Sequence, residues 1–150
     1  MTDDGRRIVP AGEGHLLTAR GNLLAFKAVA AETGGDFSLM ERTVPAGARM
    51  PPAHRHVNCS EAFFVLAGTL TFVLDSVSLD GGPGDFLLVP RGAVHTFGNR
   101  SDSPGRLLVL HAPAMDAYFE ELHRLWASPD SPPSSEAERE LMSRYGMEPA

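Results

Sequence analysis

The stretch GARMPPAHRHVNCSEAFFVLAG, residues 47–68, decides how this sequence is interpreted. His54 and His56 are two positions apart, so in an extended strand both imidazoles point to the same face. Two neutral imidazoles that face inward side by side form a metal chelate, whereas two histidines alone in an apolar core would be buried polar groups without partners. The pair therefore predicts a strand that binds a metal ion.

Glu61 lies five positions after His56, an odd separation that places it on the opposite face of a straight strand. Residues 57–60 include Asn and Ser, which suit a turn or a bulge. Such a turn returns the Glu61 carboxylate to the inner face at the start of the next strand. We interpret Cys59 as a small turn residue rather than a metal donor or a redox switch, because it has no second cysteine at metal-binding spacing.

A second cluster, GDFLLVPRGAVHTFGN, spans residues 84–99. Pro90 ends an apolar strand, and Gly92 permits a tight return into a new strand that carries His95. Three imidazoles and one carboxylate suit one divalent transition metal ion, such as iron, manganese, nickel, copper, cobalt or zinc. Up to two octahedral positions on that ion remain open. The four candidate ligands are His54, His56, Glu61 and His95.

Short apolar runs bounded by Gly, Pro, Asn or Asp fill the chain around these two clusters. A turn at Gly21-Asn22 predicts a hairpin over residues 15–26, and another strand-length stretch covers residues 37–44. Short strands at this spacing predict a β-sandwich or barrel rather than alternating β and α units. The other expected strands are residues 62–67, 70–74, 86–89 and 107–111.

The composition changes after Pro113. Apolar residues recur at helical spacing over residues 115–126 and predict an amphipathic helix. A linker rich in Ser and Pro follows, and Ser135 with Glu138 forms a capping-box signature for a last short helix. We therefore expect three parts, which are an N-terminal arm over residues 1–14, a barrel over residues 15–112 and a C-terminal helical tail over residues 113–150.

Length and charge exclude several classes of protein. A chain of 150 residues suits one domain, and a net charge of −6 disfavours a partner made of nucleic acid. No apolar run is long enough to cross a bilayer, and the first residues lack the apolar segment of a signal peptide. With a single cysteine, the chain suits a reducing compartment. We expect a cytoplasmic protein without a membrane partner.

The two clusters together resemble the paired motifs of the cupins. The second cluster has the cupin order of Gly, five residues, Pro-x-Gly, two residues, His, three residues and Asn, position for position. The first differs only in having six positions rather than five between Gly47 and His54. The resemblance covers roughly residues 20–125 and is greatest to the small bacterial cupins named after quercetin dioxygenase. It implies an all-β double-stranded β-helix, a jelly-roll barrel that is usually a homodimer.

The resemblance also carries an expectation about chemistry. It implies that the cupin ligands fall on the same four residues, and that Glu61 is both a ligand and a base toward a substrate hydroxyl. We expect a metal-dependent, dioxygenase-like oxidoreductase that acts on a small, mainly apolar, phenolic or enolic molecule. Two alternatives remain, a non-redox cyclase, isomerase or lyase that uses the ion as a Lewis acid, and a non-catalytic module that binds a small ligand.

The expected substrate pocket is mainly apolar. Residues with the same parity as Glu61 and His95 face the cavity on the strand interpretation. His111 ends an apolar strand, and we interpret it as bonded to a backbone partner. The pocket residues expected by parity are Phe63, Val65 and Phe97. Residues 37–44 add either Met40, Arg42 and Val44 or, in the other register, Leu39, Glu41 and Thr43.

Overall fold

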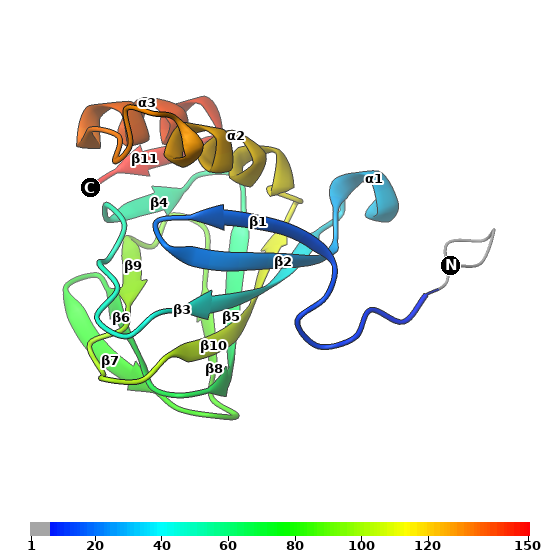
Figure 1. Cartoon of the computed structure of the whole chain (residues 1–150). Coiled ribbons are helices and arrows are strands. Elements are labelled where there is room, and N and C mark those ends of the chain that lie inside the picture. Colours follow the sequence, from blue (N-terminus) through cyan, green and yellow to red (C-terminus); the bar gives the residue numbers. More distant parts are fainter. Residues whose placement is uncertain (1–6) are drawn as a thin grey trace.

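The computed structural model describes residues 7–150, and its core is a pair of antiparallel β-sheets that face each other (Figure 1). The first six residues of the expected N-terminal arm lie outside the described residues. The six-stranded sheet has the spatial order β1-β2-β3-β10-β5-β8. Its strands are β1 (His15–Ala19), β2 (Asn22–Ala28), β3 (Ser38–Val44), β10 (Gly105–Ala112), β5 (Ser60–Ala67) and β8 (Phe86–Val89).

The five-stranded sheet has the order β11-β4-β9-β6-β7. In both sheets the paired strands run antiparallel, and one apolar core lies between the sheets. The expected jelly-roll barrel is therefore confirmed. The strands of this sheet are β11 (Met147–Pro149), β4 (His54–His56), β9 (His95–Gly98), β6 (Leu70–Leu74) and β7 (Val77–Gly81).

The predicted N-terminal hairpin is present as β1 and β2, but its turn lies one residue earlier than expected. Arg20 and Gly21 are the two turn residues, with φ values of 54° and 75°, and Asn22 begins β2. A two-residue turn in which both φ values are positive matches the twist of the strands it joins. Asn22 is thereby free to place its side chain inside the barrel, where it is buried.

Two turns in the clusters that carry the candidate ligands require glycine. Gly68 has a φ of 75°, and a Cβ there would lie 2.6 Å from the carbonyl oxygen of Pro104. Gly92 has a φ of 85°, and its N–H donates to the carbonyl oxygen of His56 (2.9 Å). The turn that precedes His95 is thus tied to the strand that carries His56.

The C-terminal segment contains α2 (Asp116–Ala127), α3 (Ser135–Arg144) and β11, and it covers the end of the barrel beside β1 and β4 (Figure 1). Both predicted helices are present. The predicted capping box is wrong, because Ser134 is the N-cap and accepts a hydrogen bond from the N–H of Ala137 (3.1 Å). Glu138 is instead buried and faces the barrel. β11 is absent from the strands expected from the sequence, and it pairs with β4.

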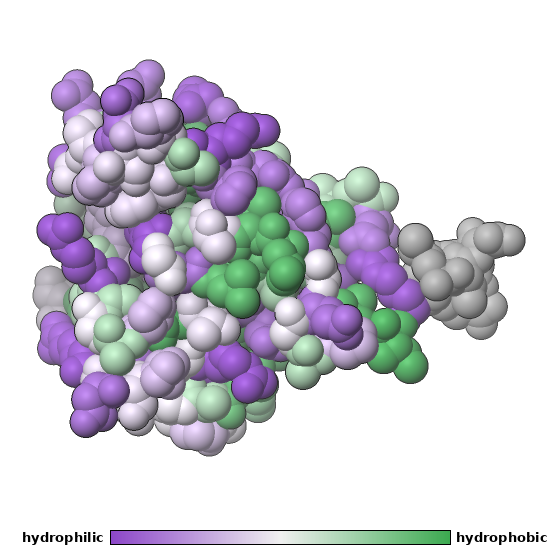
Figure 2. Space-filling view, viewed as in Figure 1, coloured by the Kyte–Doolittle hydropathy of each residue, from purple (hydrophilic) through white to green (hydrophobic). Residues whose placement is uncertain are grey.

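A short helix, α1 (Ala30–Thr33), lies between β2 and β3. Within residues 7–150, no helix is both long and apolar enough to span a membrane. Figure 2 shows hydrophilic residues over α2 and α3 and a hydrophobic patch over the face that carries β1 and β2. The expected homodimer stays a prediction, which a measurement of molecular mass in solution tests.

Candidate metal centre

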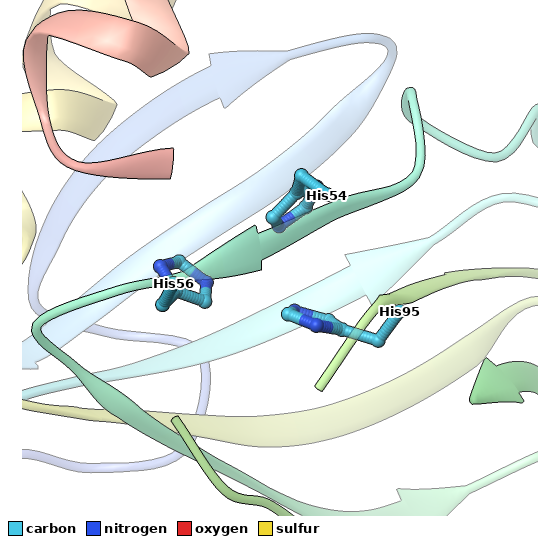
Figure 3. Close-up of side chains that lie close together, drawn as sticks. All are labelled: His54, His56 and His95. Atoms are coloured by element: carbon cyan, nitrogen blue, oxygen red, sulfur yellow. The ribbon is translucent and has the colours of Figure 1, made fainter. Parts of the chain in front are cut away.

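Two neighbouring strands bring three histidines together. His54 and His56 are the inward-facing residues of β4, and Arg55 between them is exposed. His95 begins β9 and is the direct antiparallel partner of His54. Figure 3 shows the three imidazoles gathered between these strands, and one nitrogen of each lies within 4.8 Å of one nitrogen of the other two.

Glu61 reaches the same space through the turn that the sequence predicts. Residues 57–59 separate β4 from β5, and the turn places Glu61 on the inner face, where it is buried. Its Oε2 accepts a hydrogen bond from Nε2 of His56 (2.9 Å), and its Oε1 lies 3.5 Å from Nε2 of His95. The two clusters of the sequence therefore meet in one site.

The backbone sets the tautomer of two of the histidines. Nδ1 of His54 donates to the carbonyl oxygen of Pro52 (2.8 Å), and Nδ1 of His95 donates to that of Ala93 (2.9 Å). A proton on Nδ1 leaves Nε2 unprotonated, with the lone pair that a metal ion requires. Among the described residues, the buried Nε2 of His95 has no hydrogen-bond partner. This nitrogen therefore has a lone pair that is free to bind a metal ion.

The structure adds His111, for which we had expected a backbone partner. His111 lies on β10 directly opposite Glu61 of β5, and its Nε2 makes a close hydrogen bond to Oε2 of Glu61. His56, Glu61 and His111 form a second group whose ligand atoms lie within 4.8 Å of one another. The alternation of β10 contained the signal, because Leu107 and Val109 share the parity of His111.

The charges of the site depend on burial and on the contacts around Glu61. Burial opposes ionisation of Glu61, but the charge of His111 and the hydrogen bonds from His111 and His56 outweigh it and hold the pKa of Glu61 well below its usual value. Burial, and then the charge of His95, lower the pKa of His54 to about 4. His54 is therefore a neutral imidazole at neutral pH, which is the form that binds metal.

The pKa of His95 moves the other way. Burial lowers it, but the Glu61 carboxylate and the carbonyl oxygen of Ala93 together outweigh burial and raise it. Positive charge is thus favoured at His95, beside the ionised carboxylate of Glu61. Three imidazoles, an ionised carboxylate and an unpartnered Nε2 fit a divalent transition metal ion.

The expected pocket residues divide into two groups. Phe97 and Arg42 line the cavity of the histidines, and Met40, Arg42 and Val44 of β3 are buried. Glu41, from the other register, is also buried and lies 3.7 Å from the Lys27 ammonium.

Phe63 and Val65 line a different cavity, at the side of the barrel next to β7 and β8. The rings of Phe63, Phe72 and Phe97 pack together with centroids 5.1–5.9 Å apart. Met40 is fully buried and does not line the histidine cavity. These side chains point inward, but they lie too far along their strands to line the cavity of the candidate metal site.

The cavity beside the candidate ligands is small and is closed by the C-terminal segment. Its volume is about 30 Å³, close to the share of one water molecule in the liquid. Tyr118 of α2, Met142 of α3 and Met147 of β11 form its wall opposite the strands. In this conformation the cavity therefore has room for a ligand of only a few atoms.

An antiparallel double-stranded β-helix with a cluster of His and Glu inside one end defines a class of small metal-binding barrels. Comparison with known proteins gives this class a name, since the family described as Cupin domain matches residues 40–111. Residues 40–111, which contain all four candidate ligands, therefore match the cupin family.

Three similar proteins accompany this match. Quercetin 2,3-dioxygenase from Bacillus subtilis (strain 168) is 32% identical over 90 residues, which are 60% of this chain and 26% of that enzyme. The structure of KdgF from Halomonas sp. is 16% identical, with a TM-score of 0.63 over 74% of this chain and 98% of the other. The Schizosaccharomyces pombe Cnp3 cupin domain is 20% identical, with a TM-score of 0.57 over 66% and 68%. These two structures support the fold alone.

Proposed function

We propose that this chain is a metal-dependent, dioxygenase-like oxidoreductase that acts on a small phenolic or enolic molecule. The observation that carries the proposal is the buried cluster of His54, His56 and His95 beside an ionised Glu61, whose Oε1 lies 3.5 Å from Nε2 of His95. The similarity to quercetin 2,3-dioxygenase supports the same class of reaction, although the match spans about a quarter of that enzyme.

The proposed metal ligands are His54, His56, Glu61 and His95. A divalent redox metal held there supplies a binding position for O₂ and for a substrate oxygen. Both oxygen atoms of O₂ enter the product in a dioxygenase reaction, so no external reductant is needed. The protein's part is to orient the substrate, to exclude water and to hold a proton.

Glu61 and His111 hold that proton. The carboxylate of Glu61 is ionised and buried, so it accepts a hydrogen bond from a substrate hydroxyl. A low pKa makes Glu61 alone a weak base, but Nε2 of His111 already contacts the same carboxylate oxygen. This contact keeps the carboxylate oxygen in place beside the substrate hydroxyl. Phe97 and the C-terminal segment keep the surrounding space dry.

Oxygen uptake tests this proposal. Protein loaded with Fe²⁺, Mn²⁺ or Ni²⁺ is given a panel of phenolic and enolic compounds, and we expect metal-dependent consumption of one O₂ per substrate. Because Glu61→Gln removes the proton acceptor and keeps the side-chain shape, kcat should fall by about 10²-fold or more. Glu140→Gln, an exposed change on α3, is the matched control.

Two outcomes would contradict the proposal. Turnover under strict anaerobiosis, or with Zn²⁺ in place of a redox metal, would favour a cyclase, isomerase or lyase that uses the ion as a Lewis acid. Binding of a compound from the panel without turnover under either condition would favour a module that only binds a ligand.

A further inference from the structure

Two arginines share the cavity of the candidate metal ligands. Arg42 extends from β3 and Arg20 from the turn between β1 and β2, and both line the cavity together with His56 and Glu61. Arg42 is 4% exposed, and the side chain of Arg20 is 9% exposed. Buried guanidinium groups are uncommon unless an anion balances them.

Arg42 has no such anion within the protein. Its Nε donates to Oδ1 of Asn22 (3.0 Å), and its guanidinium carbon lies 5.0 Å from the centre of the Phe97 ring. Among residues 7–150, no carboxylate forms an ion pair with it. Burial, and then the charge of Arg20, lower the pKa of Arg42 to about 10, so it is still a cation at neutral pH. A buried positive charge is therefore held by neutral groups.

Arg20 is only partly satisfied. Its Nε donates to Oε1 of Glu138 on α3 (2.8 Å), and the same oxygen accepts a hydrogen bond from the indole N–H of Trp126 (2.9 Å). Its Nη2 is buried and has no hydrogen-bond partner in the part of the chain that the structure describes. A buried donor without an acceptor is destabilising. A ligand that brings an acceptor removes this cost.

Asn22 holds both arginines in place. Its Oδ1 accepts from Arg42, and its Nδ2 donates to the backbone oxygen of Arg20 (2.9 Å). Tyr118 lies in the same cavity, and burial raises the pKa of its phenol while the neighbouring charge of Arg20 opposes that rise. The acceptors nearby are engaged, since Glu138 binds Arg20 and Glu61 binds two histidines. The cavity thus has donors in excess.

We propose that Arg42 and Nη2 of Arg20 form a subsite for a carboxylate beside the metal ligands. The substrate is then a small carboxylic acid whose reacting oxygen faces His54, His56 and His95. This inference rests on the proposed function and names the charge of its substrate. Arginine pairs with a carboxylate through two parallel hydrogen bonds, which fixes orientation as well as binding.

Formate and its neutral isostere formamide are the probes, because the cavity of about 30 Å³ is small and formate is the smallest carboxylate. Affinity is measured by calorimetry on Zn²⁺-loaded protein, and the visible spectrum of the Co²⁺-loaded protein reports whether the probe reaches the metal ion. Formate should bind at least tenfold more tightly than formamide. Arg42→Gln should weaken formate binding by tenfold or more and leave formamide binding within twofold.

Matched variants separate the subsite from general damage to the fold. Arg139→Gln makes the same chemical change at an exposed position of α3 and should bind formate like the original protein. Arg20→Gln should weaken formate binding and Arg42→Lys should retain part of it, so these variants carry the test if Arg42→Gln does not fold. Metal content and circular dichroism verify each variant.

Formate affinities of Arg42→Gln and Arg20→Gln within twofold of Arg139→Gln would overturn the subsite. Equal affinities for formate and formamide in the original protein would also overturn it. The proposed function fails separately, through absent oxygen uptake by protein that retains its metal and still distinguishes the two probes.

Discussion

The inner faces of β5 and β9 each carry a polar side chain that belongs to the candidate metal site and an aromatic side chain that belongs to the apolar core. Glu61 on β5 lines the polar cavity and lies 3.5 Å from His95 on β9, whereas Phe63, two residues further along β5, packs against the rings of Phe72 and Phe97. Phe97 of β9 touches both regions. Side chains of the same parity thus form the candidate metal site near one end of the barrel and pack the apolar core in its middle. Each region should be separable by mutation.

Phe63→Ala should give the largest loss of stability. Phe63 is 1% exposed and packs against the rings of Phe72 and Phe97, so its removal should lower the free energy of unfolding by about 3–5 kcal/mol. Metal content per folded chain should not change. Urea unfolding and elemental analysis of the same sample measure the two effects. The contrast fails if Phe63→Ala removes the metal as well.

Acidification should weaken the polar region of the metal-free protein. The folded pKa of His54 is about 4 against an ordinary value of 6.5, so the unfolded chain takes up a proton first as pH falls. The stability contributed by neutral His54 is present above pH 6.5 and is lost as pH falls toward 4, by up to about 3 kcal/mol. The raised pKa of His95 opposes part of this loss.

His54→Gln tests the origin of that loss, because it removes the titrating group. Urea unfolding in the presence of a chelator, at several pH values between 7 and 4, should show a smaller decrease for His54→Gln than for the original protein. Glu61 has a lowered pKa, and its contribution disappears only below its ordinary value of 4.5. Identical pH dependence in both proteins would contradict the assignment to His54.

Glu138→Gln should have a smaller effect, confined to the C-terminal segment. The change weakens the contact between α3 and Arg20 and should cost about 1–3 kcal/mol. Hydrogen exchange should speed up in α3 and β11, and a chelator should remove the metal faster, while the barrel strands keep their protection. Glu140→Gln, exposed on the same helix, is the control. Equal exchange in the two variants would show that Glu138 does not fasten the segment.

The sequence predicted the strands whose side chains alternate between core and solvent, together with the His-x-His pair. It missed β7, whose first four residues are exposed and therefore carry no burial pattern. It missed β11 because three residues, Met147–Pro149, gain their strand conformation only by pairing with β4. Local sequence patterns do not contain such long-range pairing.

The site shows the same division. The spacing of the four candidate ligands was sufficient to predict that they lie close together, because each lies on or beside a turn of recognisable composition. They are His54, His56, Glu61 and His95. His111 needed the register of β10 against β5, which places it opposite Glu61. Arg20 was beyond prediction, since its side chain reaches the cavity from a hairpin turn and only the folded chain places Glu138 beside it.

The central claim is that the barrel binds one metal ion between β4, β9 and the start of β5. The most direct test is the metal content of protein purified without added metal or chelator, compared with a His54→Ala, His95→Ala double variant. His15→Ala with His123→Ala, two histidines outside the cavity, is the matched control. We expect about one transition metal ion per chain in the original protein and the control and almost none in the double variant. Full metal content in the double variant would contradict the site.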